Sequence, residues 1–286
     1  MSTALVHIGT HKTGTTAFQQ WADGSREALL DRCGIALYEG LYGPSHFEIP
    51  LLCLRDDRTM TGRRVVPESL LGEWKDEVRR HLAQQVARPE ERLLISSESL
   101  SLLRYDDEVA ALRDLLGPRQ IKVAACLREP ASFLESYRHE MAKKGIQPSR
   151  FRASHNYVEP DTWLVKWDEM LSVWRRVLGE DRVVDFSYEV AMAQYQSSIP
   201  GVLAALSIDD TELPSWEGVT ANTRSQPERS LGVRVVRRLN RLRSDATVDS
   251  GAPPRASGPF LAGALPPQWF GSGRAAGPGG PRVRLA

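Results

Sequence analysis

Short runs of apolar residues alternate with longer amphipathic stretches along most of this chain. Three of the runs, at residues 4–8, 92–98 and 121–129, are nearly continuous, which is typical of strands buried on both faces. The stretches between them carry apolar side chains at helical spacing, as at residues 68–87. Strands that alternate with helices favour a mostly parallel sheet flanked by helices. We therefore expect an α/β fold.

Further expected elements continue the same pattern. A helix is predicted from about Gly14 to Gly34, and a short strand follows at residues 34–39. Pro130 suits the first position of a helix that runs to about Lys144. A tryptophan-rich helix is predicted over residues 161–178, and a strand over residues 181–189.

The end of the chain differs in composition from the rest. Of 286 residues, we assign 1–250 to a single α/β domain. Residues 251–286 hold eight Gly, seven Pro and seven Ala, with almost no apolar periodicity. Such a segment cannot bury enough surface to offset the entropy of ordering it, so we predict a disordered tail. It is either a linker or the product of a reading-frame error.

Charge and cysteine content narrow the functional classes. With 37 Lys and Arg against 36 Asp and Glu, the chain offers no electrostatic reason to expect nucleic acid or an anionic membrane as partner. The arginines at residues 233–244 alternate with Val and Leu, which favours a solvated helix face. Cys33, Cys53 and Cys126 are too scattered for a disulfide framework or a zinc site. With neither a signal peptide nor a membrane span in the sequence, we expect a cytoplasmic protein.

Chemistry is concentrated in residues 9–16, GTHKTGTT, where the first strand gives way to a helix. Backbone N–H groups and a helix N-terminus converge on an anion at such a junction. The two glycines have the spacing of the Walker phosphate-binding loop, GxxxxGK[ST]. Thr15, however, occupies the position of the Walker lysine, and the loop lysine is Lys12. This departure makes an ATP or GTP site less favoured.

The segment VHIGTHKTGTT resembles the 5′-phosphosulfate loop of sulfotransferases that use 3′-phosphoadenosine 5′-phosphosulfate (PAPS). The resemblance implies a P-loop NTPase-like sulfotransferase fold with no required metal. It also implies that Lys12, Thr13, Gly14, Thr15 and Thr16 bind the 5′-phosphosulfate. Lys12 would further act in catalysis by neutralising charge on the leaving phosphate.

A second segment, VAACLREPASFLESY, resembles the 3′-phosphate site of the same family. It supplies Arg128 at a strand end and Ser136 eight residues later. A guanidinium offers a planar pair of donors to a phosphate, and the hydroxyl adds a third. Residues 162–189 resemble a late family segment in which a Trp-bearing helix ends in Gly and a strand ends in Tyr-Glu. We interpret that third match as structural.

Sulfuryl transfer needs a group that takes the proton of the acceptor hydroxyl. The family uses His or Glu. His46 follows the second predicted strand, and Glu98 ends the next one, at the edge where ligands bind a parallel sheet. Glu48 and His11 are weaker candidates.

The resemblance therefore implies a PAPS-dependent sulfotransferase that acts on a hydroxyl or amine. Its partner would be a small-molecule, carbohydrate or lipid acceptor, bound by the 40–65 and 145–160 regions. Two alternatives stay open. One is a nucleoside-triphosphate-dependent small-molecule kinase with a degenerate loop. The other is a module that binds nucleotide without catalysis.

Overall fold

The computed structural model describes residues 2–58, 60, 66–143 and 145–219. All of them lie in the first of two units into which the chain divides after Ser225. The basic segment at 233–244 and the tail at 251–286 lie outside the described residues. The domain boundary at residue 250 therefore stays a prediction.

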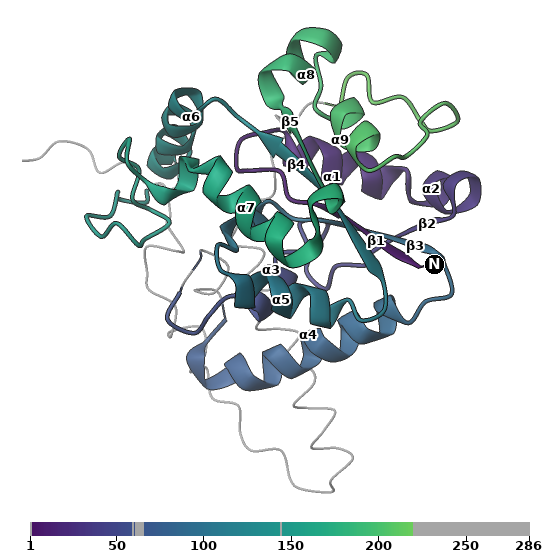
Figure 1. Cartoon of the computed structure of the whole chain (residues 1–286), viewed down its shortest axis with the longest axis horizontal. Helices are drawn as coiled ribbons and strands as arrows, with labels where there is room; N and C mark the ends of the chain where they lie inside the picture. The colour runs from purple at the N-terminus through teal and green to yellow at the C-terminus, as the bar shows by residue number, and fades with distance from the viewer. Residues whose placement is uncertain (1, 59, 61–65, 144, 220–286) are drawn as a thin grey trace, which may run out of the picture. The chain divides into compact units, whose positions relative to one another are not determined.

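Strands and helices alternate along the described chain (Figure 1). The strands are β1 (Thr3–His7), β2 (Ile35–Leu37), β3 (Arg92–Ser96), β4 (Gln120–Leu127) and β5 (Val183–Ser187). The α-helices are α1 (Thr15–Gly24), α2 (Arg26–Cys33), α3 (Glu48–Cys53), α4 (Leu71–Val86), α5 (Asp106–Leu115), α6 (Pro130–Lys143), α7 (Trp167–Leu178), α8 (Tyr188–Tyr195) and α9 (Ile199–Ala205). Short 3-10 turns include η3 (Glu98–Leu102) and η4 (Trp163–Val165).

The strands form one sheet in the order β2-β3-β1-β4-β5. Each neighbouring pair is parallel, and Val6 of β1 is in register with Ile95 of β3 and Val123 of β4. The predicted α/β fold with a parallel sheet flanked by helices is thus confirmed. Because β1 lies between β3 and β4, the loops that follow these three strands leave from adjacent positions at one edge. Ligands bind at such an edge where the chain passes from one side of the sheet to the other.

Helices cover both faces of the sheet (Figure 1). On one face, α1, α2 and α9 bury a cluster that includes Phe18, Leu29 and Val202, all fully enclosed, against Leu5 of β1. On the other face lie α3, α4, α5 and α7, which pack against one another. Successive strand residues point to opposite faces, so Val6 is directed to this second layer. Burial on both faces explains the continuous apolar runs of the central strands.

Two helix boundaries differ from the sequence predictions. The helix expected from Gly14 to Gly34 is two helices, since the chain leaves helical geometry at Ser25 after the weak helix former Gly24. The tryptophan-rich helix begins at Trp167, six residues later than predicted. The hydroxyl of Thr162 instead accepts the N–H of Leu164, which starts a short 3-10 turn ahead of the helix.

Other signals in the sequence act as predicted. Pro130 is the first residue of α6. Gly34 ends α2 in the left-handed region, at φ 63°, where glycine has no steric penalty. Within the described ranges, none of the helices combines the length and apolarity that crossing a membrane requires.

Candidate functional site

The loop from Gly9 to Gly14 joins the end of β1 to the first turn of α1, where the sequence predicts it. Thr10 fixes its start against β4, because both its N–H and its hydroxyl donate to the Cys126 carbonyl at 3.1 Å. The hydroxyl of Thr13 then donates to the carbonyl of Thr10 at 2.6 Å. These bonds hold the loop in a fixed shape beside the central strand.

Both glycines of the loop are required by its geometry. Gly14 precedes α1 with φ 78°, in the left-handed region that favours glycine. Gly9 packs so closely that a Cβ there would lie 2.6 Å from His7 Nε2 and 2.7 Å from Thr15 Oγ1. A side chain at either position would therefore strain or displace the loop.

The described residues leave the start of α1 uncapped. Among the described residues, no side chain caps this helix, and its first turn holds no acidic residue. Thr15 is buried, and its Oγ1 has no hydrogen-bond partner in the part of the chain that the structure describes. Thr16 is exposed. Uncapped N–H groups at the start of a helix, together with a buried hydroxyl, form a donor set suited to a phosphate or sulfate group.

Lys12 lies in the same loop and also adopts a positive φ, 68°. Its Nζ is 3.3 Å from Oε2 of Glu140 on α6, and about a third of each side chain is exposed. A second contact joins loop and helix, since the rings of His11 and Tyr137 lie 5.4 Å apart. The loop lysine is therefore directed toward α6, on the β4 side of the sheet edge.

Arg128 connects the second predicted motif to the loop. It follows the last residue of β4, and its guanidinium donates to the Lys12 carbonyl at 2.8 Å. Its own carbonyl accepts the indole N–H of Trp167 at 3.0 Å. The loop and the Arg128 motif, separated by 116 positions, are thus in contact. The buried Nε of the guanidinium remains without a partner among the described residues.

A hollow of about 290 Å³ adjoins Arg128 at the ends of β4 and β5. Its walls include Glu129 and Glu189 beside Phe186. The carboxylate of Glu129 accepts the N–H groups of Ser132 and Ala131, which caps α6 and holds the pKa of Glu129 below its usual value. Arg128 shares this hollow with three acidic residues, Glu129, Asp185 and Glu189, so the hollow as a whole does not favour an anion.

Ser136 is half-buried on α6. It precedes Glu140 by four residues, so the two side chains lie on one face of the helix. That face contacts the loop through Glu140 and Tyr137. Ser136 therefore lies on the face of α6 that contacts the loop, and its role beside Arg128 in a 3′-phosphate site stays a prediction.

His46 lies in the loop after β2 and is buried, with 1% of its surface exposed. Its Nδ1 accepts the backbone N–H of Ser96 at 3.0 Å, and its ring packs edge-on against Tyr38. Burial lowers the pKa of His46 to about 3, with a smaller contribution from the positive charge of Arg26. This geometry joins two segments of the sheet edge, and it does not favour the predicted role as the base.

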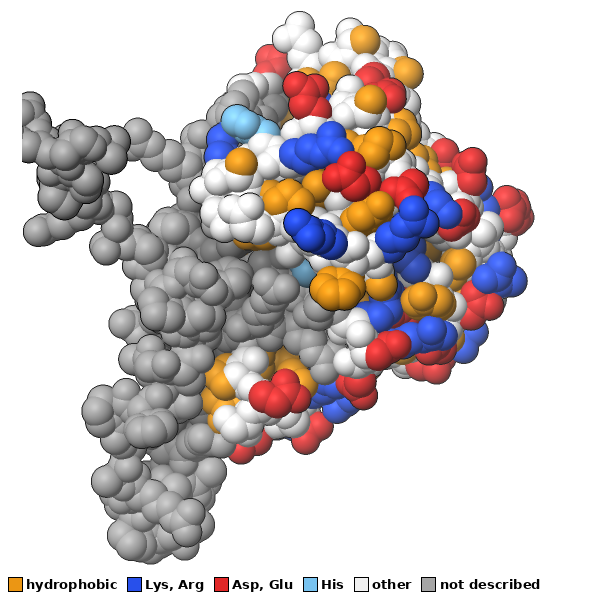
Figure 2. Space-filling model, turned by 90° about the vertical axis from the view of Figure 1, so that its left-hand side faces the viewer, with side chains coloured by type: hydrophobic (Ala, Val, Ile, Leu, Met, Phe, Trp, Pro, Cys, Tyr) orange, Lys and Arg blue, Asp and Glu red, His pale blue; other side chains and the backbone are white. Residues whose placement is uncertain are grey.

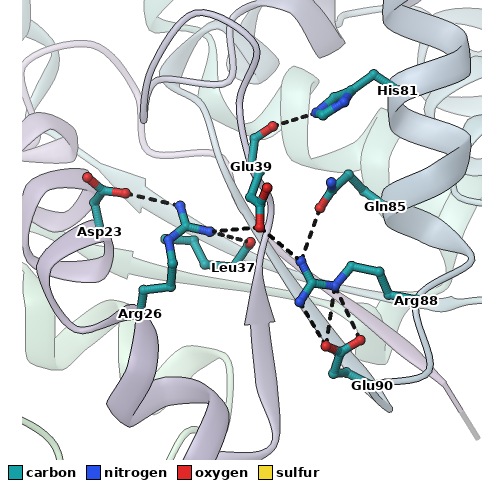
Figure 3. Close-up of polar contacts among 8 residues, drawn as sticks. All are labelled: Asp23, Arg26, Leu37, Glu39, His81, Gln85, Arg88 and Glu90. Atoms are coloured by element: carbon teal, nitrogen blue, oxygen red, sulfur yellow. Dashed lines mark hydrogen bonds and ion pairs between the residues drawn. The ribbon is translucent and has the colours of Figure 1, made fainter.

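An ion-pair network fixes the chain just after β2 (Figure 3), next to Tyr38, whose ring packs against His46. The carboxylate of Glu39 lies 3.3 Å from Arg88 and 3.9 Å from Arg26. The carbonyl of Glu39 accepts a hydrogen bond from His81 at 2.6 Å, and Arg26 donates to the Leu37 carbonyl at 3.0 Å. The edge strand is thereby attached to α2 and α4, which keeps the loop that carries His46 in place.

Glu98 begins η3 at the end of β3, at the sheet edge where the sequence places it. It is half-buried, and its Oε2 accepts a hydrogen bond from the Gln19 amide at 3.2 Å. Gln19 belongs to α1 and also donates to the Ser96 carbonyl at 3.3 Å. Glu98 therefore contacts the side of α1 that faces β3.

His7, the last residue of β1, is a polar group that the sequence analysis did not select. It is buried, its Nδ1 lies 2.9 Å from the Ser96 hydroxyl, and its Nε2 has no partner among the described residues. Burial lowers the pKa of His7 to about 3. It supports the loop from beneath, next to Gly9. The signal in the sequence that could have identified His7 is a polar residue at the end of an otherwise apolar strand.

Basic and acidic side chains are mixed on the surface that Figure 2 shows, so this face carries no large region of one sign. No group of three or more His, Cys, Asp or Glu residues is arranged to hold a metal ion within the described ranges.

Comparisons with known proteins found similarity to solved structures. No family model matches the chain, and no curated protein matches it. A solved structure, the crystal structure of a sulfotransferase from Alicyclobacillus acidocaldarius, is similar over 85% of this chain and 96% of that chain. The sequences are 14% identical, and the TM-score is 0.49. At this level of similarity, a function for the chain has to be argued from the site itself.

Proposed function

We propose that this chain is a PAPS-dependent sulfotransferase, which moves a sulfuryl group from PAPS to a hydroxyl or amine. The contact between the Arg128 guanidinium and the Lys12 carbonyl carries the proposal. It joins a second cationic group to a loop that already suits an anion. A nucleotide with phosphate at both the 5′ and 3′ positions needs two such sites.

The unsatisfied donors fit this ligand. Gly14, Thr15 and Thr16 would hold the 5′-phosphosulfate through N–H groups, and the buried Thr15 hydroxyl would gain a partner. Arg128, whose Nε has no hydrogen-bond partner in the described part of the chain, would bind the 3′-phosphate together with Ser136. These two buried polar atoms, which lack partners among the described residues, would then be satisfied by the ligand.

The loop departs from a nucleoside-triphosphate site in one specific way. In a Walker loop, a lysine directly precedes the Ser or Thr that binds Mg²⁺. Thr15 occupies that position here, and its side chain is buried. Lys12 instead approaches from the other side of the loop. A single cation at the bridging oxygen can stabilise a leaving phosphate, which is the role proposed for Lys12.

The acceptor is proposed to be a small molecule, carbohydrate or lipid that binds near residues 40–58 and 145–160. Phe151, which is 80% exposed, supports a contact surface in the second segment. A cytoplasmic location is also part of the proposal. Cys33, Cys53 and Cys126 are free thiols, and burial raises the pKa of Cys126 to about 12.

Calorimetry with 3′-phosphoadenosine 5′-phosphate (PAP), the product of transfer, tests this proposal. We expect PAP to bind far more tightly than ATP, and EDTA to leave the affinity unchanged. Tight, Mg²⁺-dependent ATP binding without affinity for PAP would instead support the kinase. Binding of PAP without transfer from radiolabelled PAPS to any acceptor in a broad panel would support the non-catalytic module.

A further inference from the structure

Glu140 is an acidic residue beside the loop lysine that the sequence does not single out. It lies on α6, and its Oε2 is 3.3 Å from Lys12 Nζ. About a third of its side chain is exposed, so a substrate can reach it. Any group that approaches the end of the Lys12 side chain therefore also approaches the Glu140 carboxylate.

Helix geometry relates Glu140 to the proposed nucleotide site. Ser136 lies four residues earlier, on the same face of α6. Tyr137, three residues earlier, contacts His11 of the loop. This face of α6 thus places a hydroxyl for the proposed 3′-phosphate site and a carboxylate within one helical turn. That carboxylate, of Glu140, lies next to Lys12, the lysine of the proposed transfer site.

The predicted bases are less well arranged for proton transfer. In His46, the Nδ1 that would take a proton already accepts the Ser96 N–H, and the ring is buried. Glu98 follows β3 and contacts α1, whereas the Lys12 side chain extends toward α6 on the β4 side. Because the sulfuryl group would lie at Lys12, a base is needed on that same side.

We propose that Glu140 takes the acceptor's proton in sulfuryl transfer, an inference that rests on the proposed function. The acceptor oxygen bonds to the sulfur of PAPS while the bond from sulfur to the bridging phosphate oxygen breaks. That electron pair leaves on the 5′-phosphate of PAP, where Lys12 neutralises it. The acceptor's proton passes to the Glu140 carboxylate. Lys12 exchanges its contact with Glu140 for the phosphosulfate, an exchange that a partly exposed ion pair permits.

The test compares Glu140→Gln with Glu135→Gln, an exposed carboxylate on the same helix. PAP affinity is measured by calorimetry. Turnover is measured with radiolabelled PAPS and a panel of phenol, amino-sugar and polysaccharide acceptors. Transfer to water, which is hydrolysis of PAPS, is measured as the last case. Glu140→Gln should lower kcat about 100-fold or more and keep PAP affinity within about three-fold. It should also remove the acidic limb of the pH profile. Glu135→Gln should match the wild type throughout.

The outcomes separate this inference from the proposed function. Failure of the wild type to bind PAP would overturn both. PAP binding with no transfer to any acceptor would support the non-catalytic module and overturn both the proposed transfer reaction and the role of Glu140. Near-normal turnover of Glu140→Gln in an otherwise active protein would overturn the role of Glu140 alone. Slow turnover of Glu140→Gln with an unchanged acidic limb would mean that Glu140 only positions Lys12, which would also overturn it.

Discussion

The two sides of the Gly9–Gly14 loop differ in how their polar groups are satisfied. On the β3 side, His7 and His46 each bond to Ser96, and all three residues are 1% exposed; among the described residues, only the buried Nε2 of His7 in this group lacks a partner. On the β4 side, Lys12 and Glu140 form a contact that solvent can reach. Polar groups bonded within the protein stabilise the loop, since leaving them unpaired would be costly. Partly exposed charges can exchange a protein partner for a ligand.

This difference assigns the chemistry to one side of the loop. The β3 side resembles a buried polar core, in which a substitution acts mainly on stability. The β4 side offers the charges and the unsatisfied donors that a charged ligand needs. We therefore expect substitutions on the two sides to separate into effects on folding and effects on binding or turnover.

Loss of the loop lysine should have the largest effect on turnover. Lys12→Ala removes the cation proposed to neutralise the leaving phosphate, so we expect turnover with PAPS to fall about 100- to 1000-fold. The melting temperature should change little, because the Lys12–Glu140 pair is partly exposed. Lys166→Ala, which removes another partly exposed ion pair, serves as the control. Equal losses in the two variants would contradict a catalytic role for Lys12.

Loss of Arg128 should act on nucleotide affinity. Arg128→Ala should weaken PAP binding by about 2 kcal/mol or more, roughly 30-fold, because charge-assisted bonds to a phosphate are lost. Adenosine 5′-phosphosulfate, which lacks the 3′-phosphate, should lose much less affinity. Arg113→Ala, at an exposed arginine, is the control. If calorimetry gave equal losses for both nucleotides, Arg128 would not bind the 3′-phosphate.

The sequence predicted the sheet and the loop because local signals determine them. Continuous apolar runs marked β1, β3 and β4, and Gly14 marked the turn into α1. The start of α7 was missed because a single hydroxyl, that of Thr162, began a different turn ahead of the helix. Helical periodicity alone does not report such a competing hydrogen bond.

The partners within the site could not be predicted in the same way. Lys12 and Glu140 are 128 positions apart, and their contact depends on how α6 packs against the loop. Nothing in the sequence around His46 shows that its ring accepts the Ser96 N–H. Motif spacing identified which segments meet at the sheet edge, but the tertiary packing decides which side chains remain available there.

The buried histidines of the β3 side should make the protein sensitive to acid. Burial lowers the pKa of both His7 and His46 to about 3, whereas an unfolded histidine titrates near 6.5. The unfolded state therefore binds more protons between these values, and stability falls as the pH drops from about 6.5 toward 3. Each histidine should contribute a slope of about 1.4 kcal/mol per pH unit.

Denaturant unfolding between pH 6.5 and 5 checks this expectation, because few carboxylates titrate there. His46→Asn keeps an acceptor near the position of Nδ1 and should reduce the slope by about one proton. His139→Gln, at an exposed histidine, should leave it unchanged. A stability that does not change with pH over this range would show that the buried rings are not held neutral.

The smallest effect on turnover is expected from Glu98→Gln. This variant is the sharpest test of the difference between the β3 and β4 sides of the loop. The amide oxygen of glutamine can still accept the hydrogen bond that Gln19 donates to Glu98 at 3.2 Å. Since this carboxylate faces the β3 side of α1, its charge should not be needed at Lys12. Turnover with PAPS should stay within about three-fold of the wild type, against the 100-fold loss expected for Glu140→Gln. The reverse result, a large loss at Glu98 and none at Glu140, would move the base to the β3 side and make the contrast between the two sides wrong.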